Sequence, residues 1–107
     1  MANTYKNAFY DPSVTTAVTV YTVPADTTGL IKNIQITNES GSKVVKVLIT
    51  DSSASTDYQI AYASITGATI CNLAKAPIVM EAGDILKIQS SDTTGISAVI
   101  SLLEIDF

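Results

Sequence analysis

The stretch that decides the fold is ISAVISLLEIDF, residues 96–107. Successive residues of an extended strand face opposite sides, so this stretch carries a separate set of side chains on each face. Both sets are mostly apolar: Ile96, Ala98, Ile100 and Leu102 on one side, and Val99, Leu103, Ile105 and Phe107 on the other. Such a strand is either central and covered on both faces, or it lies under a neighbouring subunit.

The composition of the rest of the chain favours the same kind of structure. Its 107 residues are enough for one domain. Hydrophobic residues make up 47% and charged residues 15%, and the mean hydropathy is +0.32. The chain is rich in Ile, Val and Thr and has no Trp, a composition typical of strands. We find no long window with apolar residues at helical spacing, so the sequence predicts an all-β protein.

Short alternating segments recur along the chain with turn signals roughly every ten residues. They lie at 14–23, 30–38, 43–50, 58–65, 70–73, 78–80, 85–90 and 96–107. This spacing is typical of an antiparallel β-sandwich or a small barrel of about eight or nine short strands, and we predict the sandwich, with a jelly-roll topology favoured for eight strands. Asp-Thr-Thr-Gly occurs at 26–29 and again at 92–95, each time before an aliphatic strand, and we expect the same turn at both places.

We predict a single sandwich domain over residues 14–107 and leave two interpretations open for residues 1–13. This polar segment contains three aromatic residues, Tyr5, Phe9 and Tyr10, and ends at the Asp11-Pro12 break. It is either a first edge strand whose rings cap the core, or an arm that leaves the domain and lies on a neighbour.

Charge and cysteine content exclude several classes of protein. The net charge is −4, with six Lys and no Arg, so we expect no nucleic-acid partner. The sequence has no apolar run of membrane-spanning length and no apolar signal core near its start, so we expect no membrane partner and no export signal. The single Cys71 lies in an apolar stretch and is expected to be a small buried residue, which fits synthesis in a reducing compartment.

The chain offers little for catalysis, and we predict that it is not an enzyme and needs no cofactor or metal. It has no His and one Cys, and none of the common nucleotide-binding or nucleophile motifs. The polar segment 51–57 raises the hypothesis of a calcium loop, but it lacks the usual ligand spacing and is better interpreted as a solvated connection. Tyr58, Ile60 and Tyr62 are expected on one face, where the rings would either stack on a sugar or pack across strands.

Protein contact is the function that the residues themselves favour. Val44, Leu48 and the second face of the last stretch give more outward apolar positions than a monomer of this size needs, and a chain end carrying Phe107 frays unless it is docked. We therefore expect a closed homo-oligomer, a trimer or a dimer. The candidate protein–protein interface consists of Tyr5, Phe9, Tyr10, Val99, Leu103, Ile105 and Phe107.

Three motifs give the chain a resemblance to a known group. The strand end TVYTVPA is followed by the aliphatic strand GLIKNIQITN and later by the turn EAGDIL, at residues 19–25, 29–38 and 81–86. Over residues 18–107 this pattern resembles small virion proteins of tailed bacteriophages. The resemblance implies a virion component made in the host cytoplasm, such as a capsid decoration (cement) protein or a neck or tail accessory protein, often trimeric, and no catalytic residues.

The leading hypothesis is therefore a decoration protein, with a homotrimer favoured and the major capsid protein or other virion proteins as partners. A tail or neck module that binds a host glycan through Tyr58 and Tyr62 is the alternative, and a cellular carbohydrate-binding or adhesion module is a third class. If residues 1–13 form an arm, deleting residues 1–12 should leave a folded oligomer that no longer binds capsids.

Overall fold

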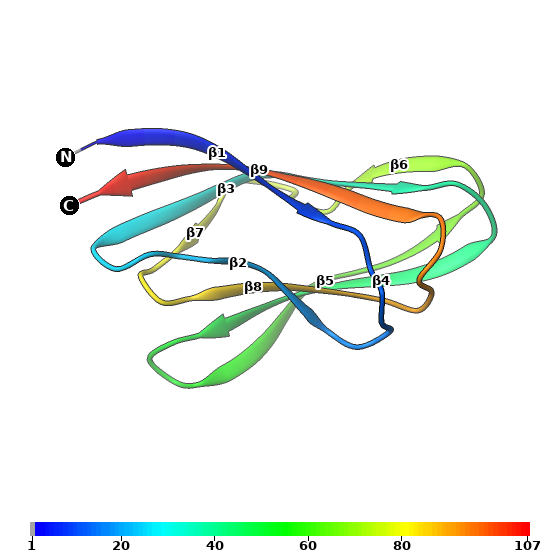
Figure 1. The fold of residues 1–107 in the computed structure, drawn as a ribbon, viewed down its shortest axis with the longest axis horizontal. Coiled ribbons are helices and arrows are strands. Elements are labelled where there is room, and N and C mark those ends of the chain that lie inside the picture. Colours follow the sequence, from blue (N-terminus) through cyan, green and yellow to red (C-terminus); the bar gives the residue numbers. More distant parts are fainter. Residues whose placement is uncertain (1) are drawn as a thin grey trace.

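A computed structural model describes residues 2–107 as two packed antiparallel sheets (Figure 1). The described residues contain nine strands and no helix that is long and apolar enough to cross a membrane. The strands are β1 (Asn3–Tyr10), β2 (Val18–Thr22), β3 (Thr27–Asn38), β4 (Ser42–Asp51), β5 (Thr56–Thr66), β6 (Thr69–Asn72), β7 (Ile78–Met80), β8 (Ile85–Ser90) and β9 (Ile96–Asp106). The all-β sandwich predicted from the sequence is confirmed.

The order of the strands is that of a jelly roll. The first sheet, here called sheet A, has the order β1-β9-β3-β6, with β7 also paired to β3, and the second, sheet B, has the order β2-β8-β4-β5. Strands β6 and β7 follow one another along the same edge of β3, so they act as one strand with an interruption. Counted in this way, eight strands are divided between two four-stranded sheets, and consecutive strands lie in different sheets except for the hairpin of β4 and β5. This is the arrangement of two Greek keys in a jelly roll.

The interruption between β6 and β7 is closed by a side chain. Asn72 Oδ1 accepts hydrogen bonds from the backbone N–H groups of Ile34 and Ala74, at 3.1 and 3.0 Å. The backbone N–H of Leu73 also donates to the carbonyl oxygen of Ile34. The central strand β3 therefore keeps its backbone partners where the edge strand breaks, as buried backbone groups must.

Strand β9 lies in the middle of sheet A, between β1 and β3. The side chains at Ile96, Ala98, Ile100 and Leu102 are buried in the core between the two sheets. The alternate residues Val99, Leu103 and Ile105 are only half-buried, on the outer face of the sheet. The last stretch is thus a central strand with one face covered by sheet B, and its second face is open in the single chain.

The amino-terminal strand β1, Asn3–Tyr10, belongs to the sandwich. Residues 3–10 pair antiparallel with β9 along their whole length, and Figure 1 shows this strand beside the carboxyl-terminal one. Of the two interpretations left open for residues 1–13, the structure shows the edge strand, which is formed by residues 3–10. The start of β1 and the end of β9 lie at the same end of the molecule, where the N–H groups of Asp106 and Phe107 donate to the carbonyl oxygens of Ala2 and Asp26.

A tyrosine of sheet B is bonded to a buried carboxylate of sheet A. The Tyr21 hydroxyl donates to Glu104 Oε2 at 2.6 Å, and Lys6 Nζ lies 3.2 Å from Glu104 Oε1. A Cβ at Gly29 would lie 3.4 Å from the Tyr21 ring and 3.2 Å from Val23, so the glycine makes room for the ring to reach across. Burial of Tyr21, together with the hydrogen bond and the charge of Glu104, raises the pKa of the tyrosine hydroxyl.

Two further polar side chains hold the loops at the two ends of the sandwich. Asn38 Nδ2 donates to the carbonyl oxygens of Gly41 and Gly67, at 3.0 and 3.1 Å, and so joins two hairpin turns. Asp84 accepts from the backbone N–H and the hydroxyl of Ser52 and from the backbone N–H of Glu81. Burial of Asp84 opposes its ionisation, but these three hydrogen bonds outweigh it and hold the pKa of the carboxyl below its usual value.

The two Asp-Thr-Thr-Gly segments do not form the same turn, so that expectation is wrong. In the first copy Asp26 has a positive φ of 55° and β3 has already begun at Thr27. In the second copy Gly95 has the positive φ, 72°, and Asp92 Oδ1 accepts hydrogen bonds from the N–H groups of Thr93 and Thr94. Asp and Gly both tolerate the left-handed region, so either end of the Asp-Thr-Thr-Gly segment can take the positive φ. The neighbouring strands decide which of the two residues does so.

Replacing Asp84 is expected to make the free energy of unfolding less dependent on pH in the acid range. The Asp84→Asn variant puts an amide N–H where an acceptor is needed, which should cost about 1–3 kcal/mol in the free energy of unfolding at neutral pH. Because the folded-state pKa is lowered, the stabilisation from Asp84 is present above the ordinary value of 3.8 and is lost as the pH falls through the folded value. Urea denaturation from pH 7 down to pH 2.5 should show the two proteins converging in acid; a constant difference would contradict this.

Removing the Tyr21 hydroxyl tests the bond between the sheets in the opposite pH range. Tyr21→Phe should lower the free energy of unfolding by about 1.5–3 kcal/mol near neutral pH, because the buried Glu104 carboxylate loses the hydrogen bond from the hydroxyl and keeps the ion pair with Lys6. Since the folded-state pKa of Tyr21 is raised, the contribution of its protonated hydroxyl is complete below 10 and falls as the pH rises above that value. Unfolding curves from pH 7 to pH 11 should therefore converge in base, with Tyr62→Phe, an exposed tyrosine on β5, as the control.

Candidate protein interface on sheet A

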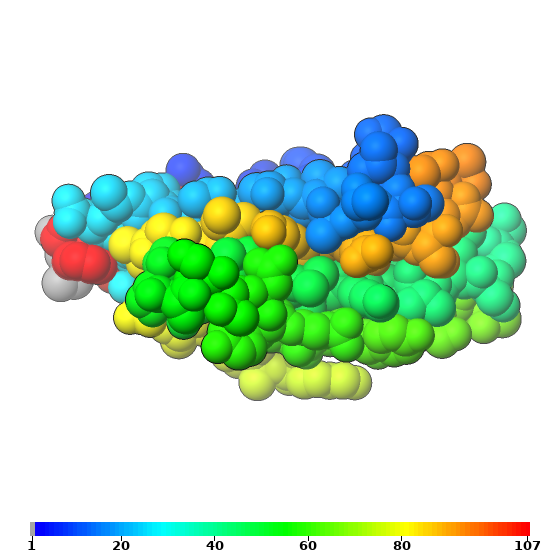
Figure 2. Space-filling view, turned by 90° about the horizontal axis from the view of Figure 1, so that it is seen from below, coloured from blue at the N-terminus to red at the C-terminus, as the bar shows by residue number. Residues whose placement is uncertain are grey.

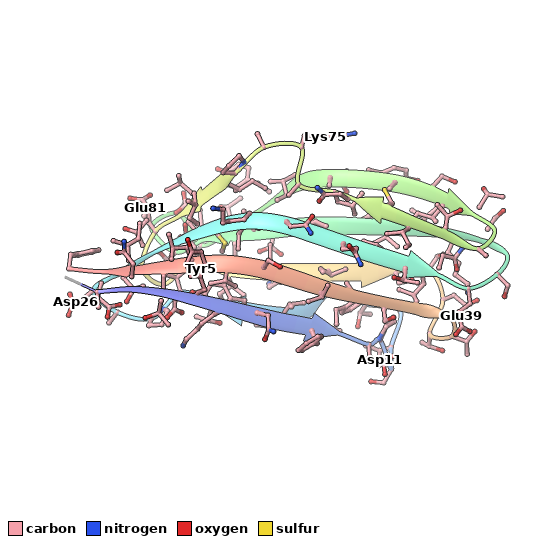
Figure 3. The ribbon with its side chains drawn as sticks, turned by 90° about the horizontal axis from the view of Figure 1, so that it is seen from above. Tyr5, Asp11, Asp26, Glu39, Lys75 and Glu81 are labelled. Carbon is pink, nitrogen blue, oxygen red and sulfur yellow. The ribbon has the colours of Figure 1, made fainter. Side chains whose placement is uncertain are left out.

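The outer face of sheet A carries an apolar row that crosses the sheet from β1 through β9 and β3 to β7. The register pairs Tyr5 with Leu103, Leu103 with Leu30, and Leu30 with Val79. Paired residues of neighbouring strands place their side chains side by side on the same face. Tyr5 and Val79 are 77% and 66% exposed, and the two leucines between them are half-buried. We call these four residues the apolar row; Figure 3 looks down on this face, with Tyr5 labelled.

A polar row and a second apolar pair follow along the same face. Asn7, Ser101 and Asn33 lie opposite one another, one step beyond the apolar row. The next step brings together Phe9, which is 71% exposed, and the half-buried Val99. The face is therefore apolar at two levels and carries amides and a hydroxyl between them, a pattern typical of the centre of a protein contact.

Charge is nearly absent from this face and present on the opposite one. Among residues 2–107, the register pairs no charged side chain on the outer face of sheet A. Lys32 lies at an irregularity of β3 without a partner in the register, and its Nζ lies 5.9 Å from the centre of the outward-facing Tyr5 ring. Lys6 lies on the inward side of β1 in the register and is bonded to Glu104. On the outer face of sheet B, which is in view in Figure 2, Lys46 and Lys87 lie on neighbouring strands, and Lys87 pairs with Asp57 at 3.4 Å. Charged residues are depleted where proteins make contact, so the two outer faces differ in the way that a contact face and a wet face differ.

The structure brings together six of the seven residues of the candidate interface predicted from the sequence. Tyr5, Phe9, Val99, Leu103 and Ile105 share the outer face of sheet A, and Phe107 is 69% exposed at the end of the same strand. Phe107 lies beside an open hollow of about 340 Å³ formed with Thr28 and the loops around Ser52 and Glu81.

Tyr10 does not belong with the others, and this corrects the sequence-based set. It pairs with Ala98 on the inner face of sheet A and is only 3% exposed. Its burial follows from the alternation of β1, in which odd-numbered residues face out and even-numbered residues face in. Burial also raises the pKa of its hydroxyl. Tyr10 is therefore a core residue, and only Tyr5 and Phe9 of the three amino-terminal aromatic residues are available for contact.

Sequence reasoning missed two members of the apolar row, Leu30 and Val79. Each lies in an ordinary alternating segment, and nothing in either segment alone singles the residue out. They join Leu103 only through the pairing of β3 with β9 and of β7 with β3. The alternation within each strand indicates which residues face outward. Combined with the strand pairing of a jelly roll, it would have placed Leu30 and Val79 beside Leu103.

The expectation that Tyr58, Ile60 and Tyr62 share one face is wrong. A bulge in β5 leaves Ile60 without a partner in the register, because Val47 pairs with Ala61 and Leu48 with Gln59. Tyr62 therefore faces outward opposite Lys46, whereas Tyr58 faces the other side of the sheet, opposite Ile49. An extra residue reverses the alternation of a strand. The two rings, 54% and 61% exposed, form no common platform for a sugar.

The polar loop before β5 uses its own groups to hold its shape. Asp51 Oδ1 accepts hydrogen bonds from the N–H and hydroxyl of Ser53. The Thr50 hydroxyl donates to Asp57 Oδ1 at 2.5 Å, and this bond, with the nearby Lys87, lowers the pKa of Asp57. Within residues 2–107, no three His, Cys, Asp or Glu side chains gather closely enough to hold a metal ion. Cys71 is half-buried and packs against the core.

The hollows on sheet A are open depressions in its outer face. One of them has a volume of about 510 Å³ and is lined by Tyr5, Lys6, Asn7, Lys32, Ser101 and Leu102. It offers two ammonium groups, an aromatic ring and an amide. Lys6 is already bonded to Glu104, and Lys32 lies over the Tyr5 ring. The arrangement is suited to contact with another protein surface.

Comparison with known proteins supports the fold. No family model matches the sequence, and no curated protein matches it. Among solved structures, the chain is similar to one from the "Structure of infectious bursal disease virus Gt strain", with a TM-score of 0.53 and 16% sequence identity. The match covers 99% of this chain and 31% of that chain. At this identity the likeness shows a shared β-sandwich fold of a kind that occurs in a virus particle.

Substituting neighbouring residues of β1 should separate contact residues from core residues. Tyr10→Ala is expected to lower the free energy of unfolding by roughly 3–5 kcal/mol, because it empties a large buried site. Phe9→Ala, one residue away on the outer face, should change it by no more than about 0.5 kcal/mol. Thermal and urea denaturation of the two variants would check this, and equal losses would contradict the placement of β1.

The same placement changes what is expected of the truncated chain. Deleting residues 1–12 removes an entire strand of sheet A together with Tyr10, so loss of the folded state is now the expected result. A role of β1 in binding is therefore better tested by Tyr5→Ser and Phe9→Ser, which leave the strand in place.

Proposed function

We propose that this chain is a non-enzymatic structural protein of a virus particle, and specifically an oligomeric decoration protein that sits across the junctions between capsid subunits and reinforces the shell. The observation that carries the proposal is the outer face of sheet A, a nearly uncharged and partly apolar surface on a rigid jelly roll. Such a surface binds protein rather than a small substrate.

Two comparisons support the viral part of the proposal. The fold is similar to that of a chain from a virus structure, and the sequence motifs resemble small virion proteins of tailed bacteriophages. The motif residues have structural roles here: Tyr21 bonds Glu104, Asn38 joins two turns, and Asp84 joins two loops. The resemblance therefore concerns residues that hold the sandwich together, and it supports a common architecture.

The fold also suits a component that must remain folded outside a cell. The described residues contain one cysteine, so rigidity comes from the packed aliphatic core and from the side-chain bonds between sheets and loops. Covering the outer face would add to this, since each fully buried Leu or Ile contributes roughly 1.5–3 kcal/mol. Binding to a shell would in this way stabilise both the decoration protein and the subunits beneath it.

The partners in this proposal are other copies of the chain, with a trimer as the order favoured by the sequence, and the major capsid protein. Tyr5, Phe9, Val99, Leu103, Ile105 and Phe107 are the residues proposed for these contacts. The alternative, a tail or neck accessory module, uses the same fold and differs in the number of copies. A glycan role for it would rest on Tyr62 alone, beside Lys46 and Gln89 in a shallow hollow of about 210 Å³.

The number of copies in the particle tests the proposal. Purified virions that carry this protein should contain hundreds of copies, spread over the shell in a density map of the intact particle. A few copies to a few dozen, placed at the neck or tail, would support the alternative. Absence from purified particles would contradict both assignments.

A further inference from the structure

We propose that a second copy of this chain covers the outer face of sheet A, so that two copies pack face to face about a two-fold axis. The inference rests on the proposed function, in which the chain is an oligomer, and it names the surface and the symmetry of the contact. Its starting point is the apolar row, in which Tyr5, Leu103, Leu30 and Val79 cross the sheet from one edge to the other.

The size of the face suits a stable contact. Four strands lie abreast in sheet A, and its central strand β9 is 11 residues long. With strands about 4.8 Å apart and about 3.3 Å per residue, the face measures about 19 by 36 Å, or about 700 Å². A specific protein contact of standard size buries about 800 Å² on each partner. One whole face of this sheet is therefore close to what a pair of copies needs.

The charge distribution favours a copy of the chain over an oppositely charged partner. The chain has a net charge of −4, so two copies repel each other wherever their carboxylates meet. On this face, within residues 2–107, the register places no carboxylate, and the ammonium group of Lys32 lies 5.9 Å from the centre of the ring of Tyr5, which belongs to the edge strand β1. The side chains of Asn7, Asn33 and Ser101 can both donate and accept hydrogen bonds, so this polar row can bond to the same row of a second copy.

The order of residues within the row suits a two-fold axis that runs parallel to the strands, between β9 and β3. This rotation places Tyr5 of one copy over Val79 of the other, and Leu103 of one copy over Leu30 of the other. It also places the polar row on the polar row. Strand directions stay aligned, as in ordinary packing of one sheet on another. A contact of this kind is isologous and closes on itself, giving a dimer alone or, with a three-fold contact elsewhere, a hexamer.

The opposite face provides the contrast. Sheet B presents Lys46, Lys87 and the ion pair of Lys87 with Asp57 to solvent. Pairing of two copies through that face would bury these charges. The few apolar side chains there, such as Leu48, do not offset the desolvation free energy. The two faces of one small sandwich thus differ, and only that of sheet A matches itself.

A charge-exchange experiment tests the contact. Leu103→Lys and Leu30→Glu are each expected to raise the dimer Kd of the purified full chain by at least about tenfold, because each buries an unpaired charge. In an equimolar mixture of the two variants the mixed dimer should form again, since the introduced ammonium of one copy faces the introduced carboxylate of the other. Sedimentation equilibrium with one labelled variant measures both effects.

Two controls keep the result interpretable. Leu48→Lys makes the same chemical change at a half-buried leucine on sheet B and should leave the association unchanged. Tyr5→Glu changes a side chain that is 77% exposed, so it should weaken the pair without affecting folding. Circular dichroism and urea denaturation at low concentration would show that each variant is folded.

Several outcomes would overturn the inference. They are a chain that remains monomeric at every concentration, association that is unchanged by both Leu103→Lys and Tyr5→Glu, and a mixture that does not recover when the single variants dissociate. Binding of monomers to capsids through Leu103 would also overturn it, because the shell and not a copy would then occupy the face. The copy number in virions is measured separately, so the proposed virion role stands or falls independently of this contact.

Discussion

The structure depends on the position of β9 as the strand shared by β1 and β3. It is the only described strand of sheet A with a full-length partner on each side, and its alternation sorts the whole sheet into an inner and an outer set of side chains. The inner set, from Ile96 to Leu102, forms the core with sheet B. The outer set then has to fall in rows with its neighbours on β1 and β3, because paired residues share a face. The contact surface is thus a direct consequence of how the core is built.

Three polar residues of the sequence motifs hold the fold together. Tyr21, Asn38 and Asp84 are polar groups placed where the sheets or loops must be joined, and Gly29 leaves the space that Tyr21 needs. Buried polar groups of this kind are costly unless every bond is made, so they specify one arrangement of sheets and turns. The fold that they specify is similar to that of a chain from a virus structure over 99% of this chain.

Alternation of apolar residues was enough to predict the strands, the sandwich and most of the contact face. What it could not supply was the pairing between distant strands, which joins Leu30 and Val79 to Leu103. It also could not supply the bulge at Ile60, since one extra residue reverses a strand without altering its composition. Tyr10 was misplaced for a related reason: three aromatic residues in a polar segment suggested a common role, whereas their parity sends Tyr10 inward and Tyr5 and Phe9 outward.

The difference between the two outer faces follows from the size of the domain. A sandwich of 107 residues has room for one core layer, so each sheet must leave its second face to water or to another protein. Sheet B carries ammonium and carboxylate groups on that face, which keep it solvated, while sheet A carries leucines, aromatic rings and amides. Side chains at these outer positions lie outside the core between the sheets. Lysines and glutamates in place of the amides and hydroxyls would therefore allow the chain to fold equally well. The scarcity of charge on the outer face of sheet A is therefore best explained by what binds to that face, and the self-matching order of its rows favours another copy of the chain.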